Sequence, residues 1–384
     1  MRLVIIGEFS SFAKNLSAGF RALGHECFVF SWGDGFKKIT QEGDSYTVNA
    51  RYKGKGKINF LKYMVRSTWE FWKLKRVVRN MSKKERWDVV LIINAGFVKK
   101  QGKFWQANFT EKMIKSLLVC PENIYLSSCG GDVPFFDFWP SQNWKNKEHA
   151  EMYKARVLSK AGISHFNYLA SFVNKVIPIS YSYAEPWRNS EYSKSFIICP
   201  TIPLPVDTKK HDYYNKIEDK IVVFHGIIRP KSKGTNYILP AMQKLQEKYP
   251  DKVECIAKGG MPLDEYLDVL SRTNIVIDQV YASTAGMNGL YILAKGKVLL
   301  GGNEPENAKE YGQSYIPIIN IGPDTDQIFL ELEKLILHPE DIIRLSKEGR
   351  EYVEKVHESK VVAKKYVEIF NKYNKRETKT AYLR

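Results

Sequence analysis

A strand, a basic loop and the start of a helix follow one another within the stretch 222–245, which reads VVFHGIIRPKSKGTNYILPAMQKL. The apolar run at 222–224 is typical of a buried parallel strand. After Gly234, apolar residues recur at helical spacing, namely Ile238, Leu239, Met242 and Leu245. Pro240 fits only the first turn of a helix, so we expect the helix to begin close after Gly234.

The loop of this stretch carries positive charge. Arg229 and Lys233 stand between the strand and the helix. The free N–H groups and the positive dipole end of a helix N-terminus attract anions, and these two side chains would add charge-assisted hydrogen bonds. The stretch therefore predicts an anion-binding loop. The alternative is a solvated basic loop that merely joins a strand to a helix.

The chain opens on a similar pattern. Residues 2–6 form an apolar run that ends at Gly7, a helical repeat follows over 12–23, and residues 27–30 form a second apolar run. This order predicts a parallel α/β sheet. Gly7 is not part of a GxGxxG sequence, so the dinucleotide fingerprint is absent. Gly7 either lets a ligand approach the end of the first strand or makes a tight turn.

A second polar turn follows the predicted strand at 123–127. It reads Ser-Cys-Gly-Gly-Asp over residues 128–132. An aspartate placed just past a strand and two glycines lies where doubly wound sheets bind ligands, but it also suits the cap of a turn. Both roles stay open for Asp132 on the sequence alone.

Prolines divide the chain near its middle. Pro200, Pro203 and Pro205 interrupt the alternation of strands and helices, and the polar run 208–220 follows. Alternation then resumes and ends in two helices separated by Pro339, the second of which, at 341–373, we expect to reach back to the first half. A chain of 384 residues has room for two to three domains. We therefore predict two Rossmann-like α/β halves.

Composition excludes several classes of protein. No stretch approaches the roughly 20 apolar residues of a membrane span, and residues 3–6 are too short for the apolar core of a secretion signal. The five cysteines are odd in number and lack metal-binding spacing. This usage is typical of the reduced thiols of a cytoplasmic protein.

The ordered set of motifs resembles the GT-B glycosyltransferases, specifically the retaining, family 4-like "glycosyl transferases group 1" set that uses nucleotide-sugar donors. The resemblance covers about residues 1–372. It is carried by the opening strand, loop and helix at 7–27, the Gly-Gly-Asp-Val turn at 130–133, Pro-Leu-Pro-Val-Asp-Thr at 203–208, His-Gly…Arg…Lys-Gly-Thr at 225–235, and the glycine, helix and Gly-Lys of 286–297.

The resemblance implies an α/β fold with two Rossmann-like domains that face each other across a cleft. Residues 1–205 would form the acceptor-side domain, joined by a returning C-terminal helix at 355–384. Residues 206–354 would form the domain that binds the nucleotide-sugar donor. The implied activity is that of a hexosyltransferase-like enzyme in cell-surface polysaccharide synthesis, such as lipopolysaccharide or capsule, with a glycan or lipid-linked glycan as acceptor.

The resemblance also assigns residues. It implies catalytic roles for Asp132, Arg229 and Lys233. The implied donor-binding residues are Gly7, His225, Gly226, Gly234, Thr235, Ser283, Gly286, Met287, Asn288, Gly289 and Tyr291. The family usually has two glutamates in this donor segment, and alignment on the glycines places them at Ser283 and Tyr291, so neither carboxylate is present. The donor, and activity itself, are therefore open on the sequence.

The mechanism implied by the family is front-face transfer with retention and without a covalent intermediate. Such folds need no metal and no cofactor, because Arg and Lys side chains neutralise the leaving diphosphate. The sequence agrees, since the nearest paired aspartates, Asp324 and Asp326, open a predicted helix and are better explained as capping residues. A catalytically inactive GT-B protein that serves as a binding or assembly partner is the alternative, supported by Ser283 and Tyr291.

Positive charge is concentrated in one segment. Residues 51–86 hold thirteen Lys and Arg against two Glu, a net +11 out of the whole-chain +17. Within them, 60–81 combines bases with tryptophans at helical spacing, which predicts a basic amphipathic helix that binds an anionic membrane surface. Core packing with a solvated basic face would explain most of its apolar residues. A nucleic-acid partner is not expected, because no RNA- or DNA-binding signature accompanies the charge. The expected location is the cytoplasm, peripherally at the inner face of the cell membrane.

Overall fold

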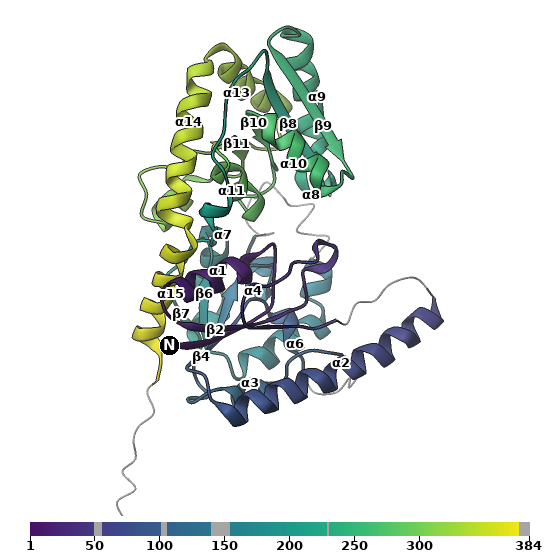
Figure 1. The fold of residues 1–384 in the computed structure, drawn as a ribbon, viewed down its shortest axis with the longest axis vertical. Helices are drawn as coiled ribbons and strands as arrows, with labels where there is room; N and C mark the ends of the chain where they lie inside the picture. Colours follow the sequence, from purple (N-terminus) through teal and green to yellow (C-terminus); the bar gives the residue numbers. More distant parts are fainter. Residues whose placement is uncertain (50–55, 101–105, 140–153, 229, 376–384) are drawn as a thin grey trace, which may run out of the picture.

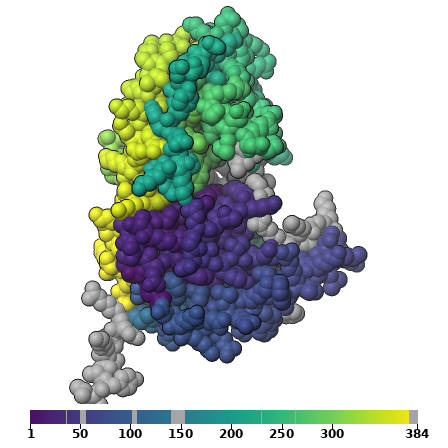
Figure 2. Space-filling model, in the orientation of Figure 1, coloured from purple at the N-terminus to yellow at the C-terminus, as the bar shows by residue number. Residues whose placement is uncertain are grey.

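The computed structural model describes residues 1–49, 56–100, 106–139, 154–228 and 230–375. Two parallel sheets, one from each half of the chain, form its two lobes (Figure 1). In Figure 2 the second lobe, green to yellow, stands on the first, purple to blue, and the C-terminal segment runs down beside both. The α/β class and the two Rossmann-like lobes predicted from the sequence are confirmed.

The first sheet has seven parallel strands in the order β3-β2-β1-β4-β5-β6-β7. From β1 the chain adds β2 and β3 on one side of the sheet and then β4 to β7 on the other side, so the direction of strand addition reverses between β1 and β4, as in dinucleotide-binding folds. The strands are β1 (Arg2–Ile6), β2 (Glu26–Ser31), β3 (Ser45–Thr47), β4 (Val89–Ile92), β5 (Ile124–Ser128), β6 (Lys175–Pro178) and β7 (Ile197–Ile198).

Helices cover both faces of this sheet, which explains why its inner strands are continuous apolar runs. Leu3 and Ile5 of β1 join one buried cluster with helix α1, whereas Val4 and Ile6 join the cluster on the opposite face. The α-helices among the described residues of this lobe are α1 (Phe12–Ala22), α2 (Lys57–Lys84), α3 (Glu111–Leu117), α4 (Val133–Phe138), α6 (Lys160–Ala170) and α7 (Tyr181–Asn189).

The second sheet has five parallel strands in the order β12-β11-β10-β8-β9. These are β8 (Ile221–Ile227), β9 (Val253–Gly259), β10 (Ile275–Ile277), β11 (Val298–Gly301) and β12 (Ile319–Asn320). The helices of this lobe are α8 (Pro230–Lys233), α9 (Thr235–Lys248), α10 (Leu263–Arg272), α11 (Met287–Ala294), α12 (Pro305–Glu310), α13 (Thr325–Leu337) and α14 (Pro339–Tyr352).

The end of the chain returns to the first lobe, as predicted. Helix α15 (Ser359–Tyr373) packs against α1 so closely that a Cβ on Gly19 would lie 2.1 Å from the backbone oxygen of Ser359. The predicted single helix at 341–373 is wrong in one respect, because it breaks at Glu358. There the backbone is extended, and it pairs with Val206 of the interlobe link through hydrogen bonds of 2.7 and 2.9 Å.

Other local predictions also needed correction. Helix α9 begins at Thr235 as expected, but Pro240 lies in its second turn rather than its first. The sequence did not predict strand β3 or helices α3, α6 and α7. Residues 376–384 of the predicted returning segment fall outside those described. The division of the domains at residue 205 stays a prediction.

Candidate functional site

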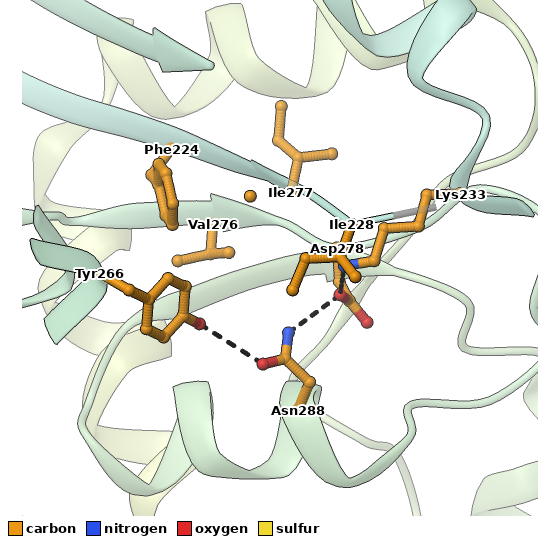
Figure 3. Close-up of a pocket in the computed structure, with 9 residues that line it drawn as sticks. Phe224, Ile228, Lys233, Tyr266, Val276, Ile277, Asp278 and Asn288 are labelled. Carbon is orange, nitrogen blue, oxygen red and sulfur yellow. Dashed lines mark hydrogen bonds and ion pairs between the residues drawn. The ribbon is translucent and has the colours of Figure 1, made fainter. Parts of the chain in front are cut away.

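The second sheet reverses its strand order between β8 and β10, and parallel sheets bind ligands at such a point, beyond the carboxyl ends of the strands. A pocket lies there in the structure (Figure 3). Lys233 reaches it from the end of α8, Asp278 follows β10 directly, and Asn288 comes from the first turn of α11. Three separate segments therefore place polar side chains at one spot.

These side chains are hydrogen-bonded to one another. The Lys233 ammonium lies 2.7 Å from Asp278 Oδ1, and the Asn288 amide donates to the same oxygen at 3.0 Å. The side chains of Lys233 and Asp278 are only 12% and 6% exposed. Lys233 thus lies at the pocket, beside the strand and the helix that the anion-loop prediction concerned. Its charge is already balanced by the carboxylate of Asp278, which the sequence interpretation missed. The signal for Asp278 was an aspartate directly after a buried strand, the pattern that was noticed at Asp132.

The other predicted catalytic cation cannot be placed, because Arg229 lies outside the described residues. Gly226, near the carboxyl end of β8, lines the pocket. Gly234 follows Lys233 in a left-handed conformation, with φ of 73°, and a Cβ there would lie 2.2 Å from a methyl group of Val280. The glycine is therefore required by the turn that aims Lys233 at the pocket.

His225 and Thr235 were predicted to bind the donor, but their side chains bond to each other inside the lobe. The Nδ1–H of His225 donates to the Ile277 carbonyl at 2.8 Å, and Nε2 accepts from the Thr235 hydroxyl at 2.9 Å. His225 is fully buried, and this burial lowers the pKa of its imidazole, which keeps it neutral. The pair fastens β8 to β10 and to the start of α9, which makes it a structural support of the pocket.

The predicted donor segment around α11 divides into buried and available positions. Met287 is buried in the core, and a Cβ on Gly289 would lie 2.9 Å from Leu299, so both serve packing. Gly286 precedes the helix, and a Cβ there would meet no atom within 4 Å. Gly286 and Asn288 are therefore the two positions of this turn that leave room or side-chain atoms for a ligand.

Tyr291 and Ser283 occupy the places of the two expected glutamates. The Tyr291 hydroxyl donates to the Ser10 carbonyl at 3.2 Å and accepts from the Asn15 amide at 3.0 Å, so it joins α11 to the first lobe. Burial raises the pKa of this phenol to about 12. The Ser283 hydroxyl is buried and has no hydrogen-bond partner among the described residues. Neither residue supplies the negative charge of the glutamate it replaces.

The loop that meets Tyr291 is conformationally strained. Ser10 and Ser11 both have positive φ, at 51° and 68°, which is uncommon for residues with a Cβ and is concentrated at functional sites. Gly7 also has positive φ, and a Cβ there would lie 2.5 Å from the Phe97 ring. The structure therefore supports the tight-turn interpretation of Gly7, because an aromatic ring fills the space beside it.

Glu8 is a residue of this loop that sequence reasoning missed. It is fully buried, and Oε2 accepts from the Lys14 N–H at 3.0 Å and from the Gln41 amide at 2.8 Å. Its Oε1 has no partner among the described residues. Burial raises the pKa of the Glu8 carboxyl. A buried carboxyl with one unsatisfied oxygen beside a strained loop is typical of a functional position.

The sequence left a ligand-binding role and a capping role open for Asp132, and the structure gives it the capping role. One carboxylate oxygen caps α4 by accepting from the Phe135 N–H at 3.0 Å. The other accepts from the Ser128 hydroxyl at 2.7 Å and the Trp187 indole at 2.9 Å. Because both oxygens are occupied by groups of its own lobe, the residue is a buried structural cap. Burial raises the pKa of this carboxyl.

The two lobes meet through polar contacts on several elements. Arg188 of α7 forms a bidentate ion pair with Glu310 of α12, with distances of 2.6 and 3.0 Å. The Tyr311 hydroxyl donates to the Ile179 carbonyl at 2.8 Å. These contacts join the two lobes, and Tyr291 joins the strained loop of the first lobe to α11, whose first turn lines the pocket of the second.

The described parts of the chain contain neither a cluster of metal ligands nor a membrane-spanning helix. No group of three or more His, Cys, Asp or Glu side chains is arranged to hold a metal ion there. Asp324 accepts from two backbone N–H groups at the start of α13, which confirms the predicted capping role. No helix in those parts is both long enough and apolar enough to cross a membrane.

No protein-family model and no curated protein sequence matches the chain. Solved structures do. Sucrose-phosphate synthase from Thermosynechococcus elongatus is 12% identical with a TM-score of 0.57, and Anabaena HepE, solved in complex with UDP and glucose, is 11% identical with a TM-score of 0.55. TarM of S. aureus is 9% identical with a TM-score of 0.60. Each match covers 97% of this chain and 99% of the other. The protein therefore has the GT-B fold of these glycosyltransferases.

Proposed function

We propose that the protein transfers a sugar, with retention, from a nucleotide-sugar donor to a glycan or lipid-linked glycan acceptor in cell-surface polysaccharide synthesis. The observation that carries the proposal is the position of the Lys233 pocket. It lies at the strand-order reversal of one lobe, and helix α11 connects it through Tyr291 to the strained loop of the other lobe. A donor bound at the pocket would therefore point its sugar toward a loop of the facing lobe.

In this proposal Lys233 binds the diphosphate of the donor. Negative charge grows on the leaving phosphate during transfer, and a preorganised cation in a dry site stabilises that charge far better than water does. Asp278 holds the ammonium in place until a phosphate replaces or shares its contact. We include Arg229 as a second cation from its place in the sequence. With these cations the reaction needs no metal or cofactor, so an excess of EDTA is expected to leave the rate unchanged.

The donor class is supported by a protein of the same fold. HepE was solved with UDP and glucose, which makes UDP-hexoses the first donors to test. Asn288 donates and accepts hydrogen bonds at the edge of the pocket, and Tyr266 bonds to it at 3.4 Å. An amide and a phenol of this kind suit a neutral hydroxyl-bearing group, such as a ribose or a sugar, next to the charged diphosphate.

The test is turnover of a panel of UDP-, GDP-, ADP- and CMP-linked sugars by the purified protein, with the anomeric configuration of the product read by NMR. We expect one donor to be consumed and the product to keep the donor's configuration. Inversion would contradict the retaining mechanism but not the transferase. Lys233→Met should lower kcat/KM about ten- to a hundredfold, because a charge-assisted bond contributes roughly 1.5–3 kcal/mol.

A second candidate is an inactive protein of this fold that binds a partner. It is favoured by Tyr291 and Ser283, which supply no carboxylate where the family has two. The same panel separates the two candidates. Binding of a nucleotide without consumption of any donor, in the presence of candidate acceptors, would favour the inactive protein.

A further inference from the structure

Helix α2 contacts the first lobe along only one of its sides. Of its 28 residues, those that are buried are Ser67, Glu70, Leu74 and Val78, which recur every three or four positions. Its C-terminal half lies against α3. In Figure 1 its N-terminal half extends past the rest of the lobe. The opposite side of the helix therefore faces outward along its length.

That outward side is apolar over its first four turns. The exposed residues are Ile58 at 72%, Leu61 at 60%, Val65 at 70%, Trp69 at 58% and Trp72 at 57%. At about 100° per residue, they fall within a sector of about 80°, centred opposite the buried side. Two tryptophans and three aliphatic residues in one exposed stripe are unusual for a surface that faces only water. The core-packing explanation of these residues is thus wrong.

Positive charge surrounds the stripe. Helix α2 contains nine Lys and Arg and one acid, Glu70, which is buried and accepts from the Asn49 N–H at 3.2 Å. Lys73 lies 3.3 Å from the centre of the Trp69 ring, and Lys75 lies 5.0 Å from that of Trp72. The helix therefore presents bases and aromatic rings together, with no exposed carboxylate of its own between them.

We infer that this outward face of α2 docks on the surface of an anionic lipid bilayer. Aliphatic and aromatic side chains gain free energy by entering the boundary between headgroups and acyl chains, while flanking bases meet lipid phosphates. A nucleic acid would also attract the bases, but its sugar-phosphate surface offers nothing to Leu61, Val65 and Ile58. The inference concerns binding alone and stands whether or not the protein transfers a sugar.

The test is flotation of the full-length protein with vesicles of phosphatidylcholine alone or of phosphatidylcholine enriched in phosphatidylglycerol. We expect binding to the anionic vesicles at low salt, weaker binding as salt is added, and little binding to neutral ones. Each base near an anionic surface contributes about fivefold, or about 1 kcal/mol. Reversal of Lys62, Arg76 and Arg79 to Glu should therefore lower the partition coefficient about a hundredfold or more.

Matched control variants exist elsewhere on the chain. Lys355, Lys360 and Lys364 are exposed bases of the C-terminal helices, and their reversal to Glu makes the same change in net charge. Leu330→Ser with Ile343→Ser matches Leu61→Ser with Val65→Ser, because all four side chains are about half exposed or more. Only the α2 variants should lose binding. Melting temperatures should stay close to wild type in all of them, since no buried group changes.

A depth readout completes the experiment. Brominated lipids should quench the fluorescence of Trp69 and Trp72 on binding, and the quenching should disappear in Trp69→Phe/Trp72→Phe. Equal binding to neutral and anionic vesicles, absence of binding at low salt, or equal losses in the control variants would each overturn the inference. Tighter binding to RNA than to anionic vesicles at physiological salt would also overturn it and would identify a nucleic-acid surface.

Discussion

Replacement of Asp278 by Asn tests the pocket by separating its stability from its affinity for anions. In the unliganded protein Asp278 balances the charge of Lys233 at 2.7 Å, with both side chains nearly buried. Loss of one partner of a buried ion pair leaves an uncompensated charge and costs about 3–5 kcal/mol. Because Asn keeps an oxygen that can accept from Lys233, we expect a loss at the lower end of this range.

The same substitution should increase the affinity for UDP. Once its carboxylate partner is gone, the Lys233 ammonium is available to the diphosphate without competition. A gain of about 1.4 kcal/mol corresponds to tenfold tighter binding. Ligand at 100 times its Kd stabilises a fold by about 2.7 kcal/mol, so a difference of this size is measurable as a thermal shift.

The assay is thermal unfolding of wild type, Asp278→Asn and Lys233→Met with and without UDP. We expect Asp278→Asn to be the less stable protein but to show the larger shift on adding UDP, and Lys233→Met to show almost none. Asp326→Asn is the matched control, because its ion pair with Lys244 is exposed and contributes at most about 1 kcal/mol. An unchanged UDP shift in both pocket variants would refute the assignment of Lys233 to the phosphate.

Three further predictions concern buried groups. Burial lowers the pKa of His357 to about 4 from an ordinary 6.5. Between these values the unfolded chain binds a proton that the folded chain does not, so the free energy of unfolding falls as the pH drops below 6.5, by about 2 kcal/mol at pH 5. His357→Gln should flatten this pH dependence, as measured by urea unfolding. The raised pKa of the Glu8 carboxyl gives the opposite pH dependence, because the folded state keeps its proton to higher pH than the unfolded state does. The free energy of unfolding therefore falls as the pH rises through the folded pKa. Glu8→Gln should gain stability relative to wild type from pH 4.5 upward. Asp132→Asn replaces one accepting oxygen by an N–H donor, which then faces either the Phe135 N–H or the Trp187 indole N–H, and this should cost about 1–3 kcal/mol of unfolding free energy. The folded protein should keep its kcat, and a large loss of kcat would return Asp132 to the reaction.

The sequence predicted what is encoded locally. The strand, loop and helix at 221–248 carry their signals within a few residues of one another, namely an apolar run, a glycine in a left-handed turn and a helical repeat. The returning helix was also predictable, because its apolar repeat required a partner. Its break at Glu358 was not, since the reason is a backbone pairing with Val206, about 150 residues earlier.

The candidate site was less predictable, because it depends on contacts between distant segments. Sequence position placed Lys233 at the pocket but could not show that Asp278, from another strand, already holds it. Asp132 and Asp278 follow buried strands in the same way, and only the fold shows that one points into its own lobe and the other into the pocket. Likewise, α2 has apolar residues on two opposite sides, and periodicity alone does not show which side is buried.

The most direct test of the proposed site is a crystal structure of the protein with UDP bound. We predict that the diphosphate lies beyond the carboxyl ends of β8 and β10, with an oxygen within hydrogen-bond distance of Lys233 Nζ and the ammonium displaced from or shared with Asp278. A nucleotide bound elsewhere, with the Lys233–Asp278 pair unchanged at 2.7 Å, would contradict the assignment of the donor site.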